Sequence, residues 1–208
     1  MMGRTTLKRL KPGIQPPARS QSDLSIPCLL LCVAGKNLFS TNRLLIWNPM
    51  LKMRKQTDLQ PSLFVGHGSP DLLISDIPAR KFFSEVGSHF SRPRGIVVIS
   101  AHWITYGLQM TGPLAQETIH DFYGFQSRLY EIQYPATGAQ WLHDRVFSAL
   151  ARSGYSASIG SRSGLDHGAW VPLSLMYPDA DIPIIQLSLL SDALPEDHFR
   201  VGQALEGL

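Results

Sequence analysis

Two histidines, each placed where a short apolar run gives way to a polar segment, are the first candidates for chemistry. His67 follows residues 63–65, and His102 follows residues 95–99. Because ligands of open α/β sheets bind at the ends of the strands, we expect both imidazoles to lie at one edge of a sheet. Two neutral imidazoles can share a divalent metal. The alternative is that each ring caps a strand or makes a hydrogen bond within the core.

A third histidine, His167, follows Asp166 in a segment flanked by glycines and precedes the apolar residues 171–176. A carboxylate such as that of Asp166 could orient an imidazole, as carboxylates do around metal sites. We expect His167 to lie in a loop. The remaining histidines lie in or beside helical patterns, where we expect them on solvated faces: His89, His143 and His198.

The segment His120-Asp-Phe-Tyr-Gly-Phe125 combines polar and aromatic side chains. Such a loop is suited to holding a planar ring by stacking and by hydrogen bonds from His120 or Tyr123. The alternative is a surface turn whose phenylalanine side chains are buried.

The elements that must position these residues follow from hydrophobic patterning after residue 61. Short apolar runs alternate with longer amphipathic runs, which is typical of an α/β fold with a central, mostly parallel sheet flanked by helices. We expect strands at 63–65, 95–99, 129–134 and 182–190, and helices at 77–90, 138–152 and 195–208.

Charge divides the chain into two parts. Residues 1–57 hold ten Lys/Arg and one acid, whereas residues 58–208 hold nine Lys/Arg and fifteen acids. Phosphate binding needs clustered Lys/Arg, so we expect no nucleic-acid partner for residues 58–208.

Residues 1–57 also lack a hydrophobic period and contain helix-breaking runs of proline and glycine. We expect a poorly ordered basic leader at 1–57 and a single domain at 58–208. One interpretation of the leader is an organelle-targeting segment. The other is that translation begins at Met50 or Met53, so that the upstream residues are an artefact of the chosen start.

Cysteine usage and apolar run length bear on the compartment. The two cysteines, Cys28 and Cys32, are too few for a disulfide framework, which favours a reducing compartment and therefore the cytoplasm. The longest uninterrupted apolar stretch, residues 26–34, is roughly half of the ~20 residues that a membrane span needs. We therefore expect no membrane partner.

Five motifs resemble, in order, those of the class III extradiol ring-cleavage dioxygenases, specifically the DOPA 4,5-dioxygenase-like branch. The resemblance covers about residues 59–208. The motifs are Leu63-Phe-Val-Gly-His-Gly-Ser-Pro70, Val97-Val-Ile-Ser-Ala-His-Trp103, Ile119-His-Asp-Phe-Tyr-Gly-Phe125, Leu129-Tyr-Glu-Ile-Gln-Tyr-Pro-Ala136 and Gly164-Leu-Asp-His-Gly-Ala-Trp-Val-Pro-Leu173.

This resemblance implies a non-haem Fe(II) enzyme that opens a catechol such as DOPA beside its two hydroxyls and inserts both atoms of O2. It implies that His67 and His102 are metal ligands, that His167 is catalytic, and that His120, Tyr123 and His167 bind the substrate. Zn(II) suits the same histidines and stays an alternative to iron. The implied partner is a small aromatic molecule, and a homo-oligomer is compatible with the sequence.

The sequence given ends at Leu208. The resemblance implies that the general base and the third metal ligand normally come from a segment after this point. We therefore expect an incomplete catalytic domain, truncated at its C-terminus, and interpret the chain as a fragment of an active enzyme. One alternative is a degenerate, non-enzymatic protein that keeps a weak metal or aromatic-ligand site. Another is a hydrolase of similar α/β architecture with zinc at the same histidines or a nucleophile at Ser69, although Ser69 lacks the flanking glycines of a nucleophile elbow.

Overall fold

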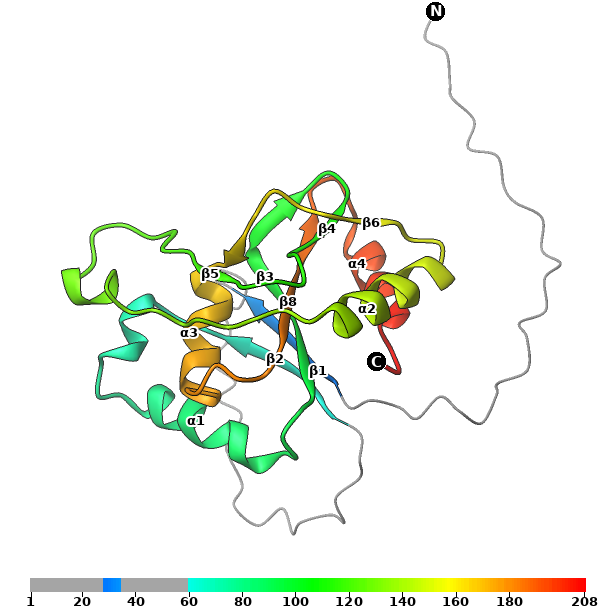
Figure 1. Cartoon of the computed structure of the whole chain (residues 1–208). Helices are drawn as coiled ribbons and strands as arrows, with labels where there is room; N and C mark the ends of the chain where they lie inside the picture. Colours follow the sequence, from blue (N-terminus) through cyan, green and yellow to red (C-terminus); the bar gives the residue numbers. More distant parts are fainter. Residues whose placement is uncertain (1–27, 35–59) are drawn as a thin grey trace, which may run out of the picture.

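A central sheet organises the fold in the computed structural model, which describes residues 28–34 and 60–208 (Figure 1). The strand order is β2-β1-β3-β8-β4-β6, and among the described strands only the β4–β8 pairing is antiparallel. The strands are β1 Cys28–Ala34, β2 Ser62–Gly66, β3 Gly95–Thr105, β4 Leu108–Met110, β6 Ala157–Ile159 and β8 Ile184–Leu190. The expected mostly parallel sheet is confirmed.

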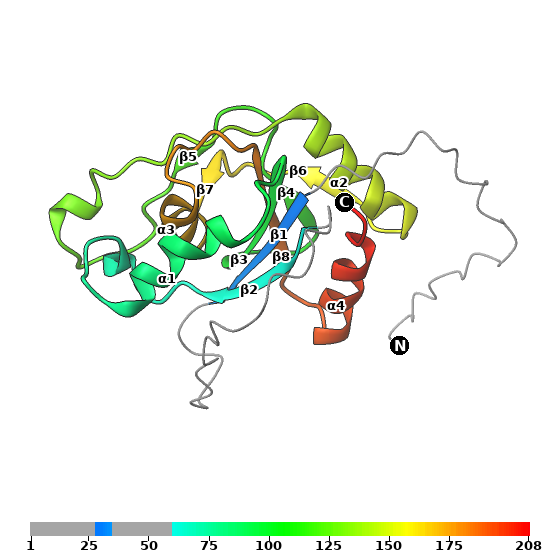
Figure 2. The ribbon, with the colours of Figure 1, turned by 90° about the horizontal axis from the view of Figure 1, so that it is seen from below.

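Helices cover both faces of this sheet, as Figures 1 and 2 show. Helices α1 (Pro78–Val86) and α3 (His167–Met176) pack on one face, and α2 (Gln140–Arg152) and α4 (Pro195–Ala204) pack on the other. The smaller elements are the 3-10 helices η1 Pro70–Leu73, η2 Gly87–His89 and η3 Ser127–Leu129, and a small separate sheet of β5 Glu117–Thr118 and β7 Gly164–Leu165. No helix in the described ranges has the length and apolarity to cross a membrane.

The alternation of side chains along β3 builds two hydrophobic cores, one on each face. Ile96 and Val98 pack with α1 and α3, whereas Val97 packs with α2 and α4. A parallel strand that is buried on both faces needs such a continuous apolar run. Because both faces are covered, β3 and β8 form the rigid middle of the molecule.

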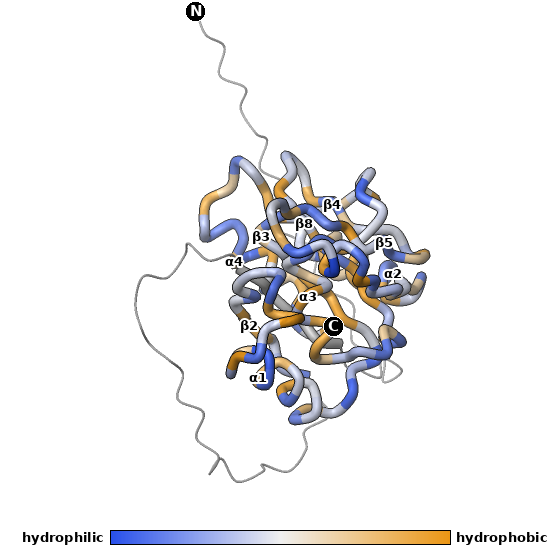
Figure 3. Tube along the Cα trace, turned by 90° about the vertical axis from the view of Figure 1, so that its left-hand side faces the viewer, coloured by the Kyte–Doolittle hydropathy of each residue, from blue (hydrophilic) through white to orange (hydrophobic). Residues whose placement is uncertain are grey.

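Local sequence signals fix where the helices begin. Pro78 occupies the first turn of α1, where a backbone N–H has no acceptor within the helix, so its missing N–H costs no hydrogen bond. Figure 3 shows α1 mixing blue and orange, in keeping with one buried face that includes Phe83 and Val86. Asp166 caps α3 by accepting a hydrogen bond from the Ala169 N–H at 3.1 Å. The helices expected at 77–90, 138–152 and 195–208 are thus confirmed, within a few residues at their ends.

The expected strand at 129–134 is wrong. Leu129 ends η3, and the following residues run as an irregular segment. The apolar side chains of Leu129 and Tyr134 are buried, but they pack against the α1 and α3 side of the core and have no partner strand. The Tyr134 hydroxyl donates to the Tyr177 carbonyl at 3.1 Å, which fixes this segment beside the end of α3.

The expectation of a poorly ordered leader is wrong for residues 28–34. They form β1, which lies between β2 and β3 and pairs in parallel with both. The run Leu29-Leu-Leu-Cys-Val33 is continuously apolar, which is the sequence character of a parallel strand. The rest of the leader prediction concerns residues outside the described ranges.

Candidate metal centre

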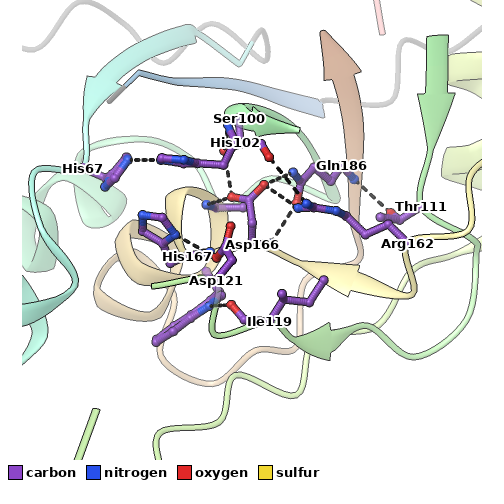
Figure 4. A network of polar contacts seen from close by, with 12 residues as sticks. His67, Ser100, His102, Thr111, Ile119, Asp121, Arg162, Asp166, His167 and Gln186 are labelled. Atoms are coloured by element: carbon purple, nitrogen blue, oxygen red, sulfur yellow. Dashed lines mark hydrogen bonds and ion pairs between the residues drawn. The ribbon is translucent and has the colours of Figure 1, made fainter. Parts of the chain in front are cut away.

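Three imidazoles meet at one edge of the sheet. His67, His102 and His167 each offer one ring nitrogen, and these atoms lie within 4.8 Å of one another. His67 Nε2 and His102 Nε2 are 2.9 Å apart. The ring centroid of His167 lies 4.1 Å from that of His102 and 5.0 Å from that of His67. Figure 4 shows the three rings converging from three separate segments of the chain.

Each histidine is carried by a different element. His67 comes directly after β2, as expected, and the next residue, Gly68, has φ 71°, a left-handed conformation that favours glycine. His102 lies inside β3, not beyond its end, because β3 continues to Thr105. His167 is the first residue of α3, not part of a loop.

The geometry of this trio suits a metal ion. Two imidazole nitrogens that bind one ion at about 2.1 Å and at right angles lie about 3.0 Å apart. The 2.9 Å between His67 Nε2 and His102 Nε2 matches that separation. Imidazole donors suit Zn(II), Fe(II), Cu(II) and Ni(II) alike. The residues therefore fit a transition-metal ion, and they offer three nitrogens where the family resemblance implied two ligands within the chain.

Protonation favours ligation at His102. Burial lowers the pKa of His102 below its usual value, and the charge of the neighbouring His167 lowers it further. The ring is therefore neutral at pH 7, which is the form that binds a metal.

Asp121 fixes the tautomer of His167. Burial opposes ionisation of this carboxyl, but hydrogen bonds from the His167 side chain and backbone outweigh it and lower the pKa of Asp121 to about 2. Asp121 Oδ1 lies 2.8 Å from His167 Nδ1 and 3.0 Å from the His167 backbone nitrogen. An ionised carboxylate only accepts, so Nδ1 carries the hydrogen. In the neutral ring, the lone pair of His167 is therefore on Nε2.

The sequence suggested Asp166, not Asp121, as the carboxylate that orients an imidazole, and this is wrong. The Asp166 side chain bonds to Ser100, Arg162, Ala169 and Gln186. Asp121 was overlooked although it stands in the aromatic motif next to His120. No rule of sequence spacing predicts that Asp121 contacts His167, because the two residues lie in distant segments of the chain.

His120 and Tyr123 stand apart from the three histidines. His120 Nε2 lies 3.0 Å from the Ile132 carbonyl oxygen, and its ring packs against aromatic neighbours. Tyr123 is 90% exposed. We use the name aromatic cluster for the rings that pack together here: His120, Phe122, Phe125, Tyr130 and Trp170. The cluster reaches the trio through Phe122, whose ring centroid is 5.7 Å from that of His167.

The remaining histidines differ in their surroundings. His89 is exposed, as expected, and its Nδ1 donates to the Glu85 carbonyl. His198 is half-buried, and its Nε2 accepts from the Leu190 N–H at 3.1 Å. His143 is also half-buried, and both of its ring nitrogens are buried without a hydrogen bond. The expectation of a solvated face is therefore wrong for His143 and His198.

Comparisons with known proteins find related sequences and a related structure. A family model described as the catalytic LigB subunit of aromatic ring-opening dioxygenase matches residues 75–208. The chain is 41% identical over 160 residues to a 4,5-DOPA dioxygenase extradiol of Beta vulgaris, covering 75% of this chain and 60% of that protein. It is 42% identical over 149 residues to a protein of the same name from Escherichia coli strain K12, covering 71% of this chain and 54% of that protein.

A solved structure is also similar. The crystal structure of an uncharacterized protein from Escherichia coli K12 matches with a TM-score of 0.50 and 36% sequence identity, covering 63% of this chain and 48% of that one. The chain thus spans 60% or less of the length of these relatives.

Proposed function

Because the chain belongs to the LigB family of aromatic ring-opening dioxygenases, we propose that it serves extradiol cleavage, the opening of a catechol such as DOPA by O2 at a non-haem metal. The observation that carries this proposal is the convergence of His67, His102 and His167, in which the Nε2 atoms of His67 and His102 lie 2.9 Å apart, a separation that suits one metal ion. Two curated relatives, 41% and 42% identical to this chain, are named for this reaction on DOPA.

We assign the metal to His67 and His102, which bind it through their Nε2 atoms. The metal we propose is Fe(II), with Zn(II) as the alternative. When bound, Fe(II) supplies open positions at which a catecholate and O2 come together. His67, which follows β2, and His102, which lies in β3, would hold it through Nε2 atoms that lie 2.9 Å apart.

We propose that His167 is the catalytic residue for proton transfer, although the family resemblance assigns the general base to a different segment. Its Nε2 carries the lone pair and can accept a proton from a catechol hydroxyl. The imidazolium that results is stabilised by Asp121, whose carboxylate stays ionised and holds Nδ1–H at 2.8 Å. Asp121 also fixes the backbone of the same residue, so ring and main chain are oriented together.

The aromatic cluster provides the apolar side of the proposed substrate site. Phe122 presents its ring to His167 in an edge-to-face arrangement, with an interplanar angle of 79°. We keep His120 and Tyr123 as proposed substrate-binding residues. The exposed phenol of Tyr123 is available to a ligand, and His120 anchors the segment that carries it.

We also propose that the enzyme works in the cytoplasm on a small aromatic partner. The supporting feature is the lack of cysteine from residue 33 onward, which suits a reducing compartment.

Oxygen uptake tests the function directly. The chain is loaded anaerobically with Fe(II), and O2 consumption and the absorbance of the ring-opened product are recorded with L-DOPA and with unsubstituted catechol. We expect uptake in proportion to product, loss of both in His67→Ala, and retention in His89→Ala, which changes an exposed histidine. Oxygen uptake by a chain loaded with Zn(II) alone shows whether zinc supports the reaction in place of iron. Uptake that survives His67→Ala, or a loaded chain that binds catechol and consumes no O2, would contradict the proposal.

A further inference from the structure

His102 occupies a stretch of β3 that the sheet does not hold in register. The ladder between β3 and β8 joins Ile99 to Leu187 and then resumes at Ile104 with Leu189. Residues 100–103 of β3 therefore face Ser188 alone on that side. Such a bulge re-aims side chains, and it leaves the backbone without its regular ladder bonds. Another set of contacts must fix the position of His102.

Two side chains form hydrogen bonds to the backbone of His102, one to its N–H and one to its carbonyl. Ser100 Oγ accepts from the His102 N–H at 3.2 Å, and Arg162 Nη2 donates to the His102 carbonyl at 3.4 Å. The guanidinium of Arg162 also lies over the ring of Trp103, with Cζ 5.3 Å from its centroid. These contacts come from two segments far apart in the sequence.

Asp166 ties the two side chains together. It is fully buried, and each of its oxygens accepts two hydrogen bonds. Oδ1 accepts from Ser100 Oγ at 2.7 Å and from the Ala169 N–H, and Oδ2 accepts from Arg162 Nη1 at 2.9 Å and from Gln186 Nε2. A buried carboxylate is tolerated when its acceptor capacity is filled in this way, and loss of one partner is costly. Figure 4 shows this group between β3, β8 and the start of α3.

Gly168 brings α3 close to the same point. A Cβ at residue 168 would lie 2.5 Å from Ser100 Oγ and 2.8 Å from His102 Cδ2. Only glycine fits this approach without a shift of one of those atoms. The first turn of α3 is thus packed directly against the imidazole of His102 and the hydroxyl that holds its backbone.

We propose that Ser100, Arg162 and Asp166, here called the clamp, are positioning residues that fix His102 in the irregular part of β3 and so set its imidazole toward His67 and His167. This inference rests on the proposed function, in which His102 binds the metal. The clamp replaces ladder bonds that the bulge removes, and it connects the metal ligand on β3 to the helix that carries His167.

Cobalt binding and amide exchange test the clamp on the full chain. Co(II) affinity and its visible absorption spectrum are measured in Arg162→Met, which keeps the aliphatic stem, in Arg162→Lys and in Ser100→Ala. Outer contacts of metal ligands are worth roughly 10–100-fold in affinity. We expect a loss of about that size with an altered spectrum in Arg162→Met, and partial recovery in Arg162→Lys. In the metal-free chain, we expect faster hydrogen exchange at the His102 amide in Arg162→Met and Ser100→Ala.

Matched variants separate positioning from general stability. Val146→Ala opens a cavity in the α2 and α4 core, on the other face of the sheet, so it lowers the unfolding temperature without touching the clamp. Gly168→Ala introduces the clash at His102, and Gly202→Ala adds the same methyl in α4, where nothing lies within 4 Å. We expect altered cobalt spectra in Gly168→Ala, and wild-type spectra in Val146→Ala and Gly202→Ala.

Two results would overturn the clamp. One is wild-type cobalt affinity and amide exchange in Arg162→Met, and the other is the same losses in Val146→Ala. A wild-type chain whose Co(II) binding does not depend on His67 would instead refute the metal site itself. In that case, hydrogen exchange at the His102 amide would test the clamp independently of metal binding.

Discussion

The two sides of the histidine trio are held by different forces. On the side of β3 and β8, the clamp is a set of hydrogen bonds around one buried carboxylate. The aromatic cluster is held mainly by ring packing, in which Trp170 is fully buried, while the neighbouring Tyr123 is exposed.

This difference separates two demands on the site. Directional hydrogen bonds hold a ligand atom within a narrow range of positions, which a metal requires. Ring packing gives a large apolar area with less directional constraint, which suits a planar substrate. We therefore expect changes in the clamp region to act on metal affinity, and changes in the aromatic cluster to act on stability and on substrate binding.

The largest effect is expected at the base of the aromatic cluster. Trp170→Ala removes a fully buried ring and the hydrogen bond from Nε1 to the Ile119 carbonyl at 2.9 Å. Large-to-small changes of this kind cost about 3–5 kcal/mol of unfolding free energy. Urea unfolding followed by circular dichroism measures the loss, with Phe199→Ala, a change at a 69% exposed ring, as the control. Equal effects in both variants would mean that packing does not hold this region.

Loss of a metal ligand is expected to rank next. In His67→Ala, one of the two nitrogens that lie 2.9 Å apart is removed. The fall in Co(II) affinity should exceed the roughly 100-fold that an outer contact can cost. Equilibrium dialysis measures it, and His89→Ala should bind like the wild type. A His67→Ala chain that retains the metal would place the ion elsewhere.

Asp121 tests the comparison between the two sides, because it lies beside the aromatic cluster but contacts the histidine trio through a hydrogen bond. Asp121→Ala leaves His167 Nδ1 without its acceptor. We expect catechol turnover to fall by roughly 100-fold or more, because His167 loses the group that orients its ring and stabilises its protonated form, and metal affinity to change little, because His67 and His102 are the proposed ligands. Asp76→Ala, at an exposed carboxylate, is the matched control. Full turnover in Asp121→Ala would remove His167 from proton transfer.

Tyr134 tests a polar contact behind the aromatic cluster. Burial raises the pKa of Tyr134 well above 10, so the native state resists ionisation of this phenol while the unfolded chain does not. The folded-state pKa lies above the unfolded value, so its contribution to stability is intact below pH 10 and is lost as the pH rises further. We expect Tyr134→Phe to lower stability by about 1 kcal/mol at pH 7 and to weaken the alkaline loss. Denaturant midpoints from pH 7 to pH 11 check this, and an unchanged alkaline slope would argue against it.

Sequence periodicity predicted the main strands and helices because buried parallel strands and amphipathic helices have strong local patterns. It failed at 129–134, where the same apolar pattern packs a loop against the core. It also missed β1, because an apolar run beside proline and within a basic segment has the composition of a leader.

The site shows a similar division. His67 and His102 were identified from their places at strand ends, although β3 runs further than its apolar core suggested. The residues that hold them were not found. Ser100, Arg162 and Gln186 lie on separate segments, and only the folded chain brings them to Asp166. A local sequence pattern cannot predict contacts between residues on separate segments.

The place of β3 at the middle of the sheet has a kinetic consequence. Its partner β8 follows much later in the chain, after α2, β6 and α3. Closing so long a loop costs entropy before any contact is gained, which makes such pairings slow to form. During synthesis, β3 therefore leaves the ribosome long before β8 can cover its edge. The apolar run at 95–99 spends that interval open to other nascent chains, and we expect refolding yield to fall as protein concentration rises.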